Sequence, residues 1–430
     1  MSRQTEALRT PKRRRGDLVG TAGWYDYYAA YSPLFVEDML RTLAIPKDGV
    51  ALDPWNGSGT TTQVAQDRGI SALGYDLNPA AVIVAKARKL HSGVLGSIRS
   101  LTAEVCQTAG TRSCNVPTPE PLENWFTRDA AETLRHLEAA IQRLLVCHAS
   151  YIRIVDLESL SSISDLAAFF YTGLFKVVRS LLGRFRTSNP TWLKFRDSDL
   201  KVDAQADDIM AGFHFAIASM LPALESRPPV SSVRCDIDIA SSTDLPLKSG
   251  SVAAVLTSPP YCTRIDYAVT TSPELAVLGM DVRSELKPLR DRMLGTSTIS
   301  VNLPITTEGL GPTCAELLEK IGSHPSKAAK SYYLKTYLQY FDGLRHSMAE
   351  IARVLQSGRP AAVVVQDSYF KDVRVDLATI VTEMGKSAGM STTTKVDFAS
   401  RRTMCSVHKY AKTYRTSTTA TESVVVMFKQ

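Results

Sequence analysis

The sequence is poor in the residues that build metal and disulfide sites. Its 430 residues include seven cysteines and seven histidines, and no two cysteines form a Cys-x-x-Cys pair. An odd number of scattered cysteines argues against a zinc ribbon or a disulfide framework and fits a reducing compartment. We therefore expect no metal site and a cytoplasmic protein.

Long apolar runs are missing as well. No stretch is long enough to span a bilayer, and the basic N-terminal segment is not followed by the apolar part of a secretion signal. Hydrophobic residues make up 44% and charged residues 22% of the chain, which is typical of a soluble globular protein. The formal net charge of +7 gives mild support for a polyanionic partner.

The chain divides into segments of different pattern. Residues 1–18 are polar and carry the run Lys12-Arg13-Arg14-Arg15, so we expect a disordered basic tail. Residues 97–230 show apolar side chains at the helical spacings of three and four. We interpret them as a helical insertion that interrupts an α/β domain formed by residues 19–96 and 231–430.

A tight glycine-rich turn follows the first strand that the pattern predicts. Gly49–Asp53 reads as a short buried strand, and Pro54–Gly59 leads into a helix from about Thr60. Such a turn lets backbone amides approach a ligand closely, and the amino end of a helix favours negative charge. A second strand, Ser71–Tyr75, ends at Asp76, where an acidic side chain can accept hydrogen bonds from both hydroxyls of a ribose. A nucleoside-type cofactor fits there; the alternative is a structural turn with an exposed aspartate.

The apolar run Val252–Leu256 stops at Thr257-Ser258-Pro259-Pro260-Tyr261. Neither proline can donate a ladder hydrogen bond, so the run reads as a buried strand that is halted at its carboxyl end. In an open α/β sheet that end faces the ligand crevice. The Ser258 hydroxyl and the carbonyls of Ser258 and Pro259 suit an amino group on a planar ring, and Tyr261 can stack on that ring. The alternative is a Pro-Pro loop with a tyrosine packed in the core.

A second irregular stretch covers residues 281–330. It is loop-like, with Gly295, Pro304, Gly309 and Gly311-Pro312, and it is too long for an ordinary connection. Because it follows the Ser-Pro-Pro-Tyr rim, it is a candidate for target recognition.

These motifs together resemble a known family. Asp53-Pro-Trp-Asn-Gly-Ser-Gly-Thr-Thr61, Gly74-Tyr-Asp-Leu-Asn-Pro79 and Thr257-Ser-Pro-Pro-Tyr261 are similar to the cofactor and catalytic motifs of DNA amino-methyltransferases. That family uses S-adenosylmethionine to methylate an exocyclic base nitrogen. The resemblance covers most of residues 22–95 and 235–430. It implies a Rossmann-like methyltransferase fold, with a mixed seven-stranded sheet and flanking helices, interrupted by the helical insertion.

The resemblance implies a role for the residues of each cofactor motif. Asp53, Gly57 and Gly59 would line the methionine part of S-adenosylmethionine, and Asp76 would bind its ribose. Asp244 would accept the adenine amino group, although it also fits a turn, and Asp53 has the alternative role of fixing the glycine-rich turn. Trp55 stands where the family usually has Phe. The predicted cofactor-binding residues are Asp53, Pro54, Trp55, Gly57, Gly59, Thr60, Thr61, Asp76, Leu77, Asn78 and Asp244, with the segment Tyr28–Phe35 completing the pocket.

The resemblance also implies that Ser258, Pro259, Pro260 and Tyr261 are catalytic. In the family, Ser at the first of these positions is commoner for cytosine N4, and Asp or Asn for adenine N6, so Ser258 favours cytosine N4. Methylation of cytosine carbon 5 needs a thiolate, normally from a Pro-Cys pair, whereas Tyr261 here separates the prolines from Cys262. A base inside a duplex cannot reach such a site, so we expect it to be flipped out.

The sequence therefore predicts a site-specific methyltransferase of double-stranded DNA. The alternatives are N6-adenine DNA methylation, methylation of a guanine amino group in tRNA and, least favoured, a non-catalytic nucleic-acid-binding protein with the same fold. The sequence shows no nuclease motif, so a restriction endonuclease or another defence partner would be encoded separately.

Overall fold

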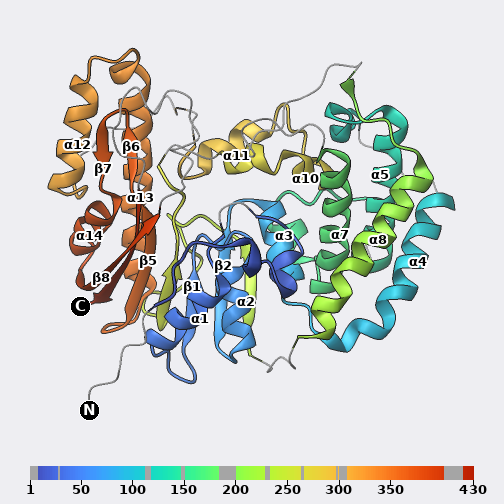
Figure 1. The fold of residues 1–430 in the computed structure, drawn as a ribbon, viewed down its shortest axis with the longest axis horizontal. Coiled ribbons are helices and arrows are strands. Elements are labelled where there is room, and N and C mark those ends of the chain that lie inside the picture. Colours follow the sequence, from blue (N-terminus) through green and yellow to red (C-terminus); the bar gives the residue numbers. More distant parts are fainter. Residues whose placement is uncertain are drawn as a thin grey trace.

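A computed structural model describes residues 8–27, 30–111, 118–146, 151–183, 200–227, 233–262, 266–296, 299, 308–400 and 420–430. Its centre is a seven-stranded sheet with the strand order β3-β2-β1-β4-β5-β9-β8, and helices lie against this sheet on both sides (Figure 1). The strands are β1 (Val50–Asp53), β2 (Ser71–Asp76), β3 (Cys235–Ile239), β4 (Ala254–Thr257), β5 (Pro360–Gln366), β8 (Met390–Ser400) and β9 (Ala420–Lys429).

The sheet is mixed, as the sequence predicted. Strands β3, β2, β1, β4 and β5 are parallel, whereas β9 runs antiparallel to both β5 and β8. The parallel strands are short and apolar on both faces, and Ala361–Val365 of β5 is fully buried. Strands buried on both faces lack the alternation of a half-exposed sheet because helices cover either side.

Two pairs of helices cover the two faces. Helices α1 (Pro33–Thr42) and α2 (Thr60–Asp67) bury their apolar side chains in one cluster with small residues of β1, β2 and β4. Helices α13 (Leu334–Val354) and α14 (Leu377–Ser387) share the opposite cluster with Leu52 and Val255. Consecutive residues of a strand therefore enter different cores, as the pleat requires.

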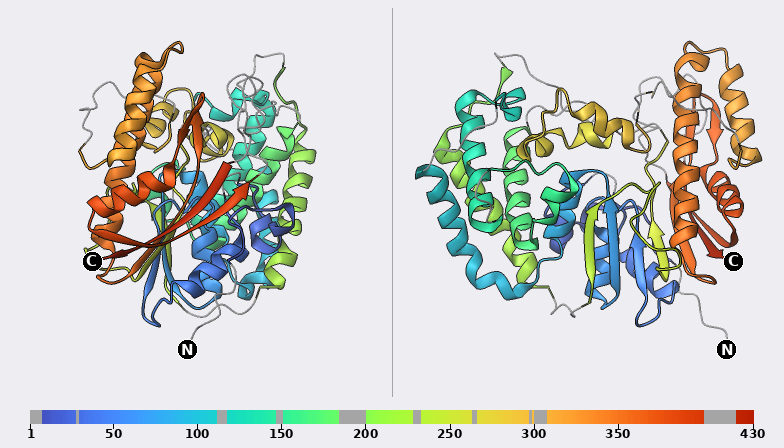
Figure 2. Two further views of the ribbon diagram at one scale, coloured as in Figure 1. Left: turned by 60° about the vertical axis from the view of Figure 1, so that its left-hand side comes forward. Right: turned by 180° about the vertical axis from the view of Figure 1, so that it is seen from behind.

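The chain between β2 and β3 forms helices that stand beside the sheet as a separate layer (Figures 1 and 2). One large apolar cluster, which includes Trp125, Phe170 and Phe213, joins these helices to each other. Among the helices of the described residues, none is both long and apolar enough to cross a membrane. The helices are α3 (Pro79–Ala87), α4 (Leu95–Thr111), α5 (Arg128–Ile141), α6 (Leu157–Ser161), α7 (Asp165–Leu181) and α8 (Ala206–Glu225).

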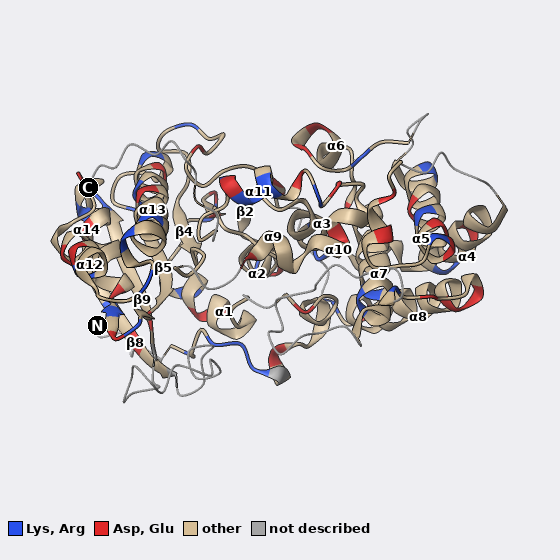
Figure 3. Cartoon of the chain, turned by 90° about the horizontal axis from the view of Figure 1, so that it is seen from above, with Lys and Arg blue, Asp and Glu red and all other residues tan. Residues whose placement is uncertain are grey.

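Three short helices follow β4 and connect the sheet to the insertion. They are α9 (Tyr267–Thr270), α10 (Ser272–Val277) and α11 (Leu286–Arg292). Helix α11 lies above the carboxyl ends of the parallel strands, and α10 lies beside α7 (Figure 1). Viewed from above, basic and acidic residues of α11 lie over these strand ends (Figure 3).

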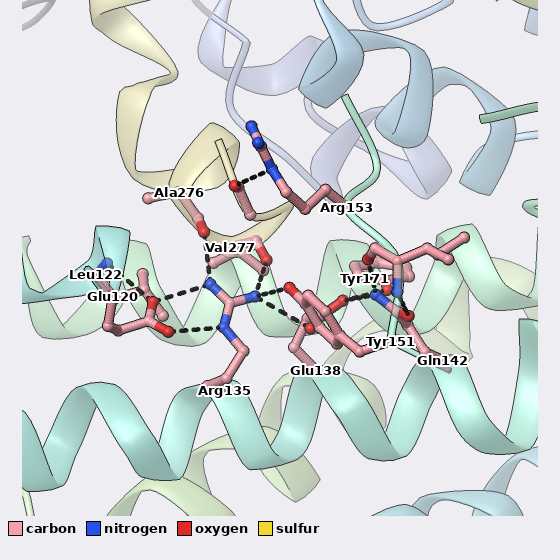
Figure 4. Close-up of polar contacts among 12 residues, drawn as sticks. Glu120, Leu122, Arg135, Glu138, Gln142, Tyr151, Arg153, Tyr171, Ala276 and Val277 are labelled. Carbon is pink, nitrogen blue, oxygen red and sulfur yellow. Dashed lines mark hydrogen bonds and ion pairs between the residues drawn. The ribbon is translucent and has the colours of Figure 1, made fainter. Parts of the chain in front are cut away.

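A buried arginine of the insertion holds α10 in place. Arg135, fully buried on α5, donates bonds of 2.9 and 3.0 Å to Glu120 and one of 3.0 Å to Glu138 (Figure 4). It also donates to the carbonyls of Ala276 at 2.8 Å and Val277 at 2.6 Å, at the end of α10. A buried charge must be paired and hydrogen-bonded, so these acceptors fix the position of α10.

A second arginine of the insertion binds the same short helix. Arg179 on α7 pairs with Glu274, whose side chain is fully buried on α10, and donates to the Thr270 carbonyl. The Tyr25 hydroxyl donates a further bond of 2.9 Å to Glu274. Arg153 of the insertion pairs with Glu285 as well, so several charged contacts join the insertion to the segment that follows β4, in addition to apolar packing.

The predicted disordered tail is wrong for residues 8–18. Arg9 donates hydrogen bonds of 2.7 and 2.6 Å to Asp38 of α1, and Arg13 pairs with Asp26 at 2.8 Å. The backbone of Lys12 forms an isolated antiparallel β-bridge with Tyr31. Arg9 and Arg13 find acidic partners on the folded domain, which a reading of local composition alone could not locate. Residues 1–7 lie outside the described residues.

The prediction of a loop over residues 281–330 is also wrong. The stretch contains α11 and α12 (Pro312–Ser323), and α12 buries Leu317, Leu318 and Ile321. Gly311-Pro312, which suggested a loop, is the start of a helix, where proline is favoured at the first positions. Residues 297–298 and 300–307 lie outside the described part of the chain.

We expect Arg135→Ala to destabilise the fold strongly. The change leaves Glu120 and Glu138 buried without their cation, which costs about 3–5 kcal/mol in comparable pairs. Urea unfolding followed by tryptophan fluorescence measures the loss. Arg128→Ala is the matched control, because Arg128 lies on the same helix with 79% of its side chain exposed in its pair with Glu132. A similar loss of stability in both variants would contradict the role of Arg135.

Candidate active site

The carboxyl ends of β1, β2, β3 and β4 open into one cleft. In an open sheet such a crevice lies where the strand order reverses, which here is between β1 and β4. Most of the predicted site residues meet in it, although they come from two distant parts of the sequence. The predicted residues that line the cleft are Asp53, Pro54, Trp55, Gly57, Thr60, Thr61, Asp76, Leu77, Ser258, Pro259, Pro260 and Tyr261.

The glycine-rich turn and the acid of β2 are joined directly. The Gly57 amide donates a bond of 2.9 Å to Asp76 Oδ2, and the Asn78 amide donates one of 2.8 Å to Asp76 Oδ1. Gly57 has φ +49°, and a Cβ atom there would lie 3.0 Å from the Tyr27 ring, so the turn requires glycine. Burial raises the pKa of Asp76 to about 6. The carboxylate still lines the cleft and can accept hydrogen bonds from a ligand.

Asp53 is satisfied from within the protein. Its Oδ1 accepts from the Thr257 hydroxyl at 2.6 Å and the Trp55 amide at 3.1 Å. Its Oδ2 accepts from the Thr61 hydroxyl at 2.6 Å and the Tyr31 hydroxyl at 3.1 Å. Burial raises the pKa of this carboxyl group, and these four bonds oppose the rise. They agree with the alternative in which Asp53 fixes the turn, and the residue also lines the cleft.

A buried arginine supports the turn from behind. Arg88 Nη1 donates bonds of 2.8 and 2.9 Å to the carbonyl and hydroxyl oxygens of Ser58. Arg88 Nη2 donates to the carbonyls of Ala22 at 3.0 Å and Tyr25 at 3.3 Å. One guanidinium group therefore binds the turn to the segment that precedes α1.

The Ser-Pro-Pro-Tyr rim is anchored at its second half. The Tyr340 hydroxyl on α13 donates a bond of 2.9 Å to the Pro260 carbonyl, and the Tyr261 hydroxyl donates one of 3.2 Å to Glu422 on β9. No described residue donates a hydrogen bond to the carbonyls of Ser258 or Pro259. Within the described part of the chain these two acceptors have no internal donor, so their predicted role toward a ligand stays a prediction.

Three predicted residues do not line the cleft. Gly59, with φ +82°, begins α2, and a Cβ atom there would lie 2.8 Å from that of Ala85, so its glycine serves helix packing. Asn78 caps α3, accepting from the Ala80 amide at 3.1 Å and donating to Thr271 at 2.8 Å. Asp244 is exposed in a turn, and its neighbours Ser241–Thr243 line the cleft instead.

Several cleft residues carry no motif in the sequence. Tyr27 and Tyr267 line the cleft, as does Tyr31 from the predicted segment Tyr28–Phe35, whose Tyr28 lies outside the described residues. For Tyr27, the cluster of tyrosines before α1 was the one feature of the sequence that could have indicated a place in the cleft. Residues of α11 and α13 had none, because only the fold brings them to the strand ends; they include Asp291, Arg292, Gln339 and Asp342.

The residues present fit an adenosyl cofactor. Asp76 offers a carboxylate at the end of the second strand, where a ribose is bound in such sheets. The Gly57 turn has no room for a side chain, and aromatic and apolar groups at Trp55 and Leu77 suit a heterocycle. The polar residues Ser241–Thr243 line the cleft after the end of β3.

Fold and cleft together define the class. The five parallel strands have the order β3-β2-β1-β4-β5, and antiparallel β9 lies between β5 and the last strand, β8. This is the strand order of the Rossmann-like methyltransferase sheet, and the cleft lies at its switch point. This confirms the predicted fold.

Among known proteins, the type II methyltransferase M.BsoBI of Geobacillus stearothermophilus is 25% identical over 292 residues, covering 63% of this chain and 55% of that protein. The chain thus spans about half the length of this relative. No family model matches the chain. The rRNA methyltransferase aviRa from Streptomyces viridochromogenes has a TM-score of 0.31 and 11% identity, covering 98% of this chain and 96% of that one. The fold assignment depends on the strand order and not on that likeness.

Asp76→Asn tests the burial of the Asp76 carboxyl group. Its pKa in the fold is about 6 against an ordinary value of 3.8, so the folded chain holds the proton more tightly than the unfolded chain. The stability from this protonation is present at low pH and is lost as the pH rises from about 4 to about 6. The Asn side chain does not titrate, so the variant does not share this loss. The free energy of unfolding of the variant minus that of the wild type should therefore rise by on the order of 2 kcal/mol between about pH 4.5 and pH 7.5.

Urea unfolding of both proteins across this pH range makes the measurement. The difference between them isolates Asp76, because all other titrating groups are shared. A difference that stays constant with pH would show that Asp76 has an ordinary pKa.

Proposed function

We propose that the protein is an S-adenosylmethionine-dependent DNA methyltransferase that modifies the exocyclic amino group of a flipped base, preferably N4 of cytosine. The observation that carries this proposal is one cleft shared by two motifs. Asp76 of the cofactor motif and Ser258 and Pro259 of the Ser-Pro-Pro-Tyr rim line it together. Cofactor and acceptor sites that share a cleft are what direct group transfer requires.

The cofactor half of the cleft would hold S-adenosylmethionine through few groups. Asp76 would accept hydrogen bonds from the ribose hydroxyls, and the Gly57 turn would bring backbone close to the ligand. Trp55 and Leu77 would contact the adenine. When bound, the cofactor supplies an electrophilic methyl group on a sulfonium sulfur.

The other half must turn an aromatic amine into a nucleophile. The lone pair of such an amine is delocalised into the ring, so the nitrogen reacts poorly until acceptors draw on its hydrogens. The Ser258 hydroxyl and the carbonyls of Ser258 and Pro259 are acceptors of this kind. They would direct the lone pair toward the methyl group, while the Tyr261 ring stacks on the base.

The chain's main contribution is then positioning. Holding nucleophile and methyl group in line can supply about 7–11 kcal/mol of the barrier reduction. Flipping the base out of a duplex costs a few kcal/mol, which stacking on Tyr261 and contacts to phosphates offset.

Two features favour cytosine N4 over other positions. Ser258 stands where the resembling family more often has Asp or Asn in adenine N6 enzymes. Methylation of cytosine carbon 5 is disfavoured, because Cys262 is 1% exposed and does not line the cleft, so its thiol cannot serve as the nucleophile.

Double-stranded DNA is the proposed substrate. The similarity to a type II methyltransferase and the net charge of +7 support it. A restriction endonuclease or another defence component would be a separate partner, and the chain would act in the cytoplasm.

The direct test is expression in a bacterial host that lacks DNA methylation. Genomic DNA is digested to nucleosides, and modified bases are measured by mass spectrometry beside a Ser258→Ala, Tyr261→Ala double variant. We expect N4-methylcytosine with the intact rim and its loss in the variant. N6-methyladenine would overturn the choice of base but keep the mechanism. No modified DNA base, with cofactor binding retained, would move the proposal to RNA.

Cofactor binding is tested separately at Asp76. Because a carboxylate that accepts from two hydroxyls is lost, Asp76→Ala should weaken S-adenosylmethionine binding about tenfold or more, measured by isothermal titration calorimetry. Asp244→Ala is the control, since Asp244 lies outside the cleft, and it should change the affinity by less than about twofold. The reverse order of effects would place the cofactor elsewhere.

A further inference from the structure

The Tyr261 ring lines the cleft, but its hydroxyl group is bound by a distant element. It donates a hydrogen bond of 3.2 Å to Glu422 Oε1 on β9, which lies 161 residues further along the chain. Glu422 itself does not line the cleft. The carboxyl group therefore reaches the candidate site only through the tyrosine.

Glu422 is an unexpected residue for its position. It is 8% exposed, and the residues that follow it on β9, Ser423 and Val424, are buried at 1% and 0%. Burial raises the pKa of its carboxyl group, and the nearby charge of Lys12 opposes the rise. A carboxylate held away from water costs several kcal/mol unless it is hydrogen-bonded. Within the described part of the chain, the Tyr261 hydroxyl is the one donor to this carboxyl group.

The rest of the rim is fixed independently. Tyr340 on α13 binds the Pro260 carbonyl at 2.9 Å, which sets the backbone on the amino side of Tyr261. That bond leaves the Tyr261 ring free to turn about its own side-chain torsions. The bond to Glu422, at the far end of the ring, together with a side-chain hydrogen bond to Ser258, fixes the direction in which the ring projects.

We propose that Glu422 is a positioning residue, which fixes the place and direction of the Tyr261 ring on which the target base stacks. The inference rests on the proposed function. Stacking depends on the relative orientation of the two planes, and small misplacements of a reacting group lower rates strongly. The role needs an acceptor oxygen at Glu422 and does not need its charge.

Three single variants separate the effect of the hydrogen bond between Tyr261 and Glu422 from the effect of the size of their side chains. Glu422→Gln keeps an acceptor oxygen, Glu422→Leu removes it, and Tyr261→Phe keeps the ring but removes the donor. We expect kcat/KM for DNA to fall about tenfold or more in the Leu and Phe variants. It should stay within about threefold of wild type in Glu422→Gln. The affinity of both Glu422 variants for S-adenosylmethionine should be unchanged.

The double variant shows whether the two groups act together. If Glu422 acts through the Tyr261 hydroxyl, then Glu422→Leu combined with Tyr261→Phe should be no worse than either alone. Multiplying effects would mean that Glu422 acts by another route and would overturn the proposal.

Ser423→Ala is the control for general damage to β9. Ser423 is the next residue on the strand, and its hydroxyl bonds Asp397 at 2.6 Å, away from the rim. Its kcat/KM should stay within about twofold of wild type. Equal losses in Ser423→Ala and Glu422→Leu, or wild-type activity in Glu422→Leu, would overturn the positioning role.

Failure of the proposed function gives a different result. If the wild-type protein methylates no DNA, the function is wrong, and the anchor is then judged by unfolding in urea. Losses of stability in Glu422→Leu and Tyr261→Phe that do not add in the double variant support the anchor. Additive losses overturn it.

Discussion

The buried carboxylate of Asp53 is the interaction on which the cleft depends. Its four hydrogen bonds come from β4, α2, the glycine-rich turn and the segment before α1. A buried carboxylate must be satisfied, so these four segments cannot shift independently. Thr257, one of the donors, is followed directly by Ser258, while Trp55, another, belongs to the turn. One group therefore sets the reaction half of the cleft relative to the cofactor half.

The insertion extends this constraint to the helices that follow the rim. Arg135 and Arg179 lie on different helices, yet both bind α10, which follows the rim after the short helix α9. Because both guanidinium groups are largely removed from water, releasing either would leave buried acceptors unpaired. The insertion is thus joined to the candidate site by specific polar contacts as well as by shape. A ligand that moved the insertion would also act on the segment that carries Tyr267.

Local signals in the sequence predicted the elements that depend on consecutive residues. The strand, turn and helix around Gly57 and the halted strand before Ser258 depend on neighbours in the chain, and the fold has them where the sequence predicted. Asp244 and Asn78 were assigned from the family resemblance. In the fold, the neighbours Ser241–Thr243 line the cleft instead of Asp244, and Asn78 caps α3. Glu422 could not be found, because β9 comes near the rim after β4 only in the folded sheet, where β5 lies between β4 and β9. The helix at Pro312 is not predicted, because Gly311-Pro312 fits both a loop and the start of a helix.

The hydrogen bonds of Arg88 bear on how far the chain can be shortened at its N-terminal side and still fold. Half of its acceptors are carbonyls of Ala22 and Tyr25, which precede every strand of the sheet. A shortened chain that began after Tyr25 would keep all seven strands and both candidate motifs, yet it would leave a buried guanidinium group partly unpaired behind the glycine-rich turn. The folded unit therefore begins upstream of the first regular helix, in a segment that carries two of the hydrogen-bond acceptors of Arg88.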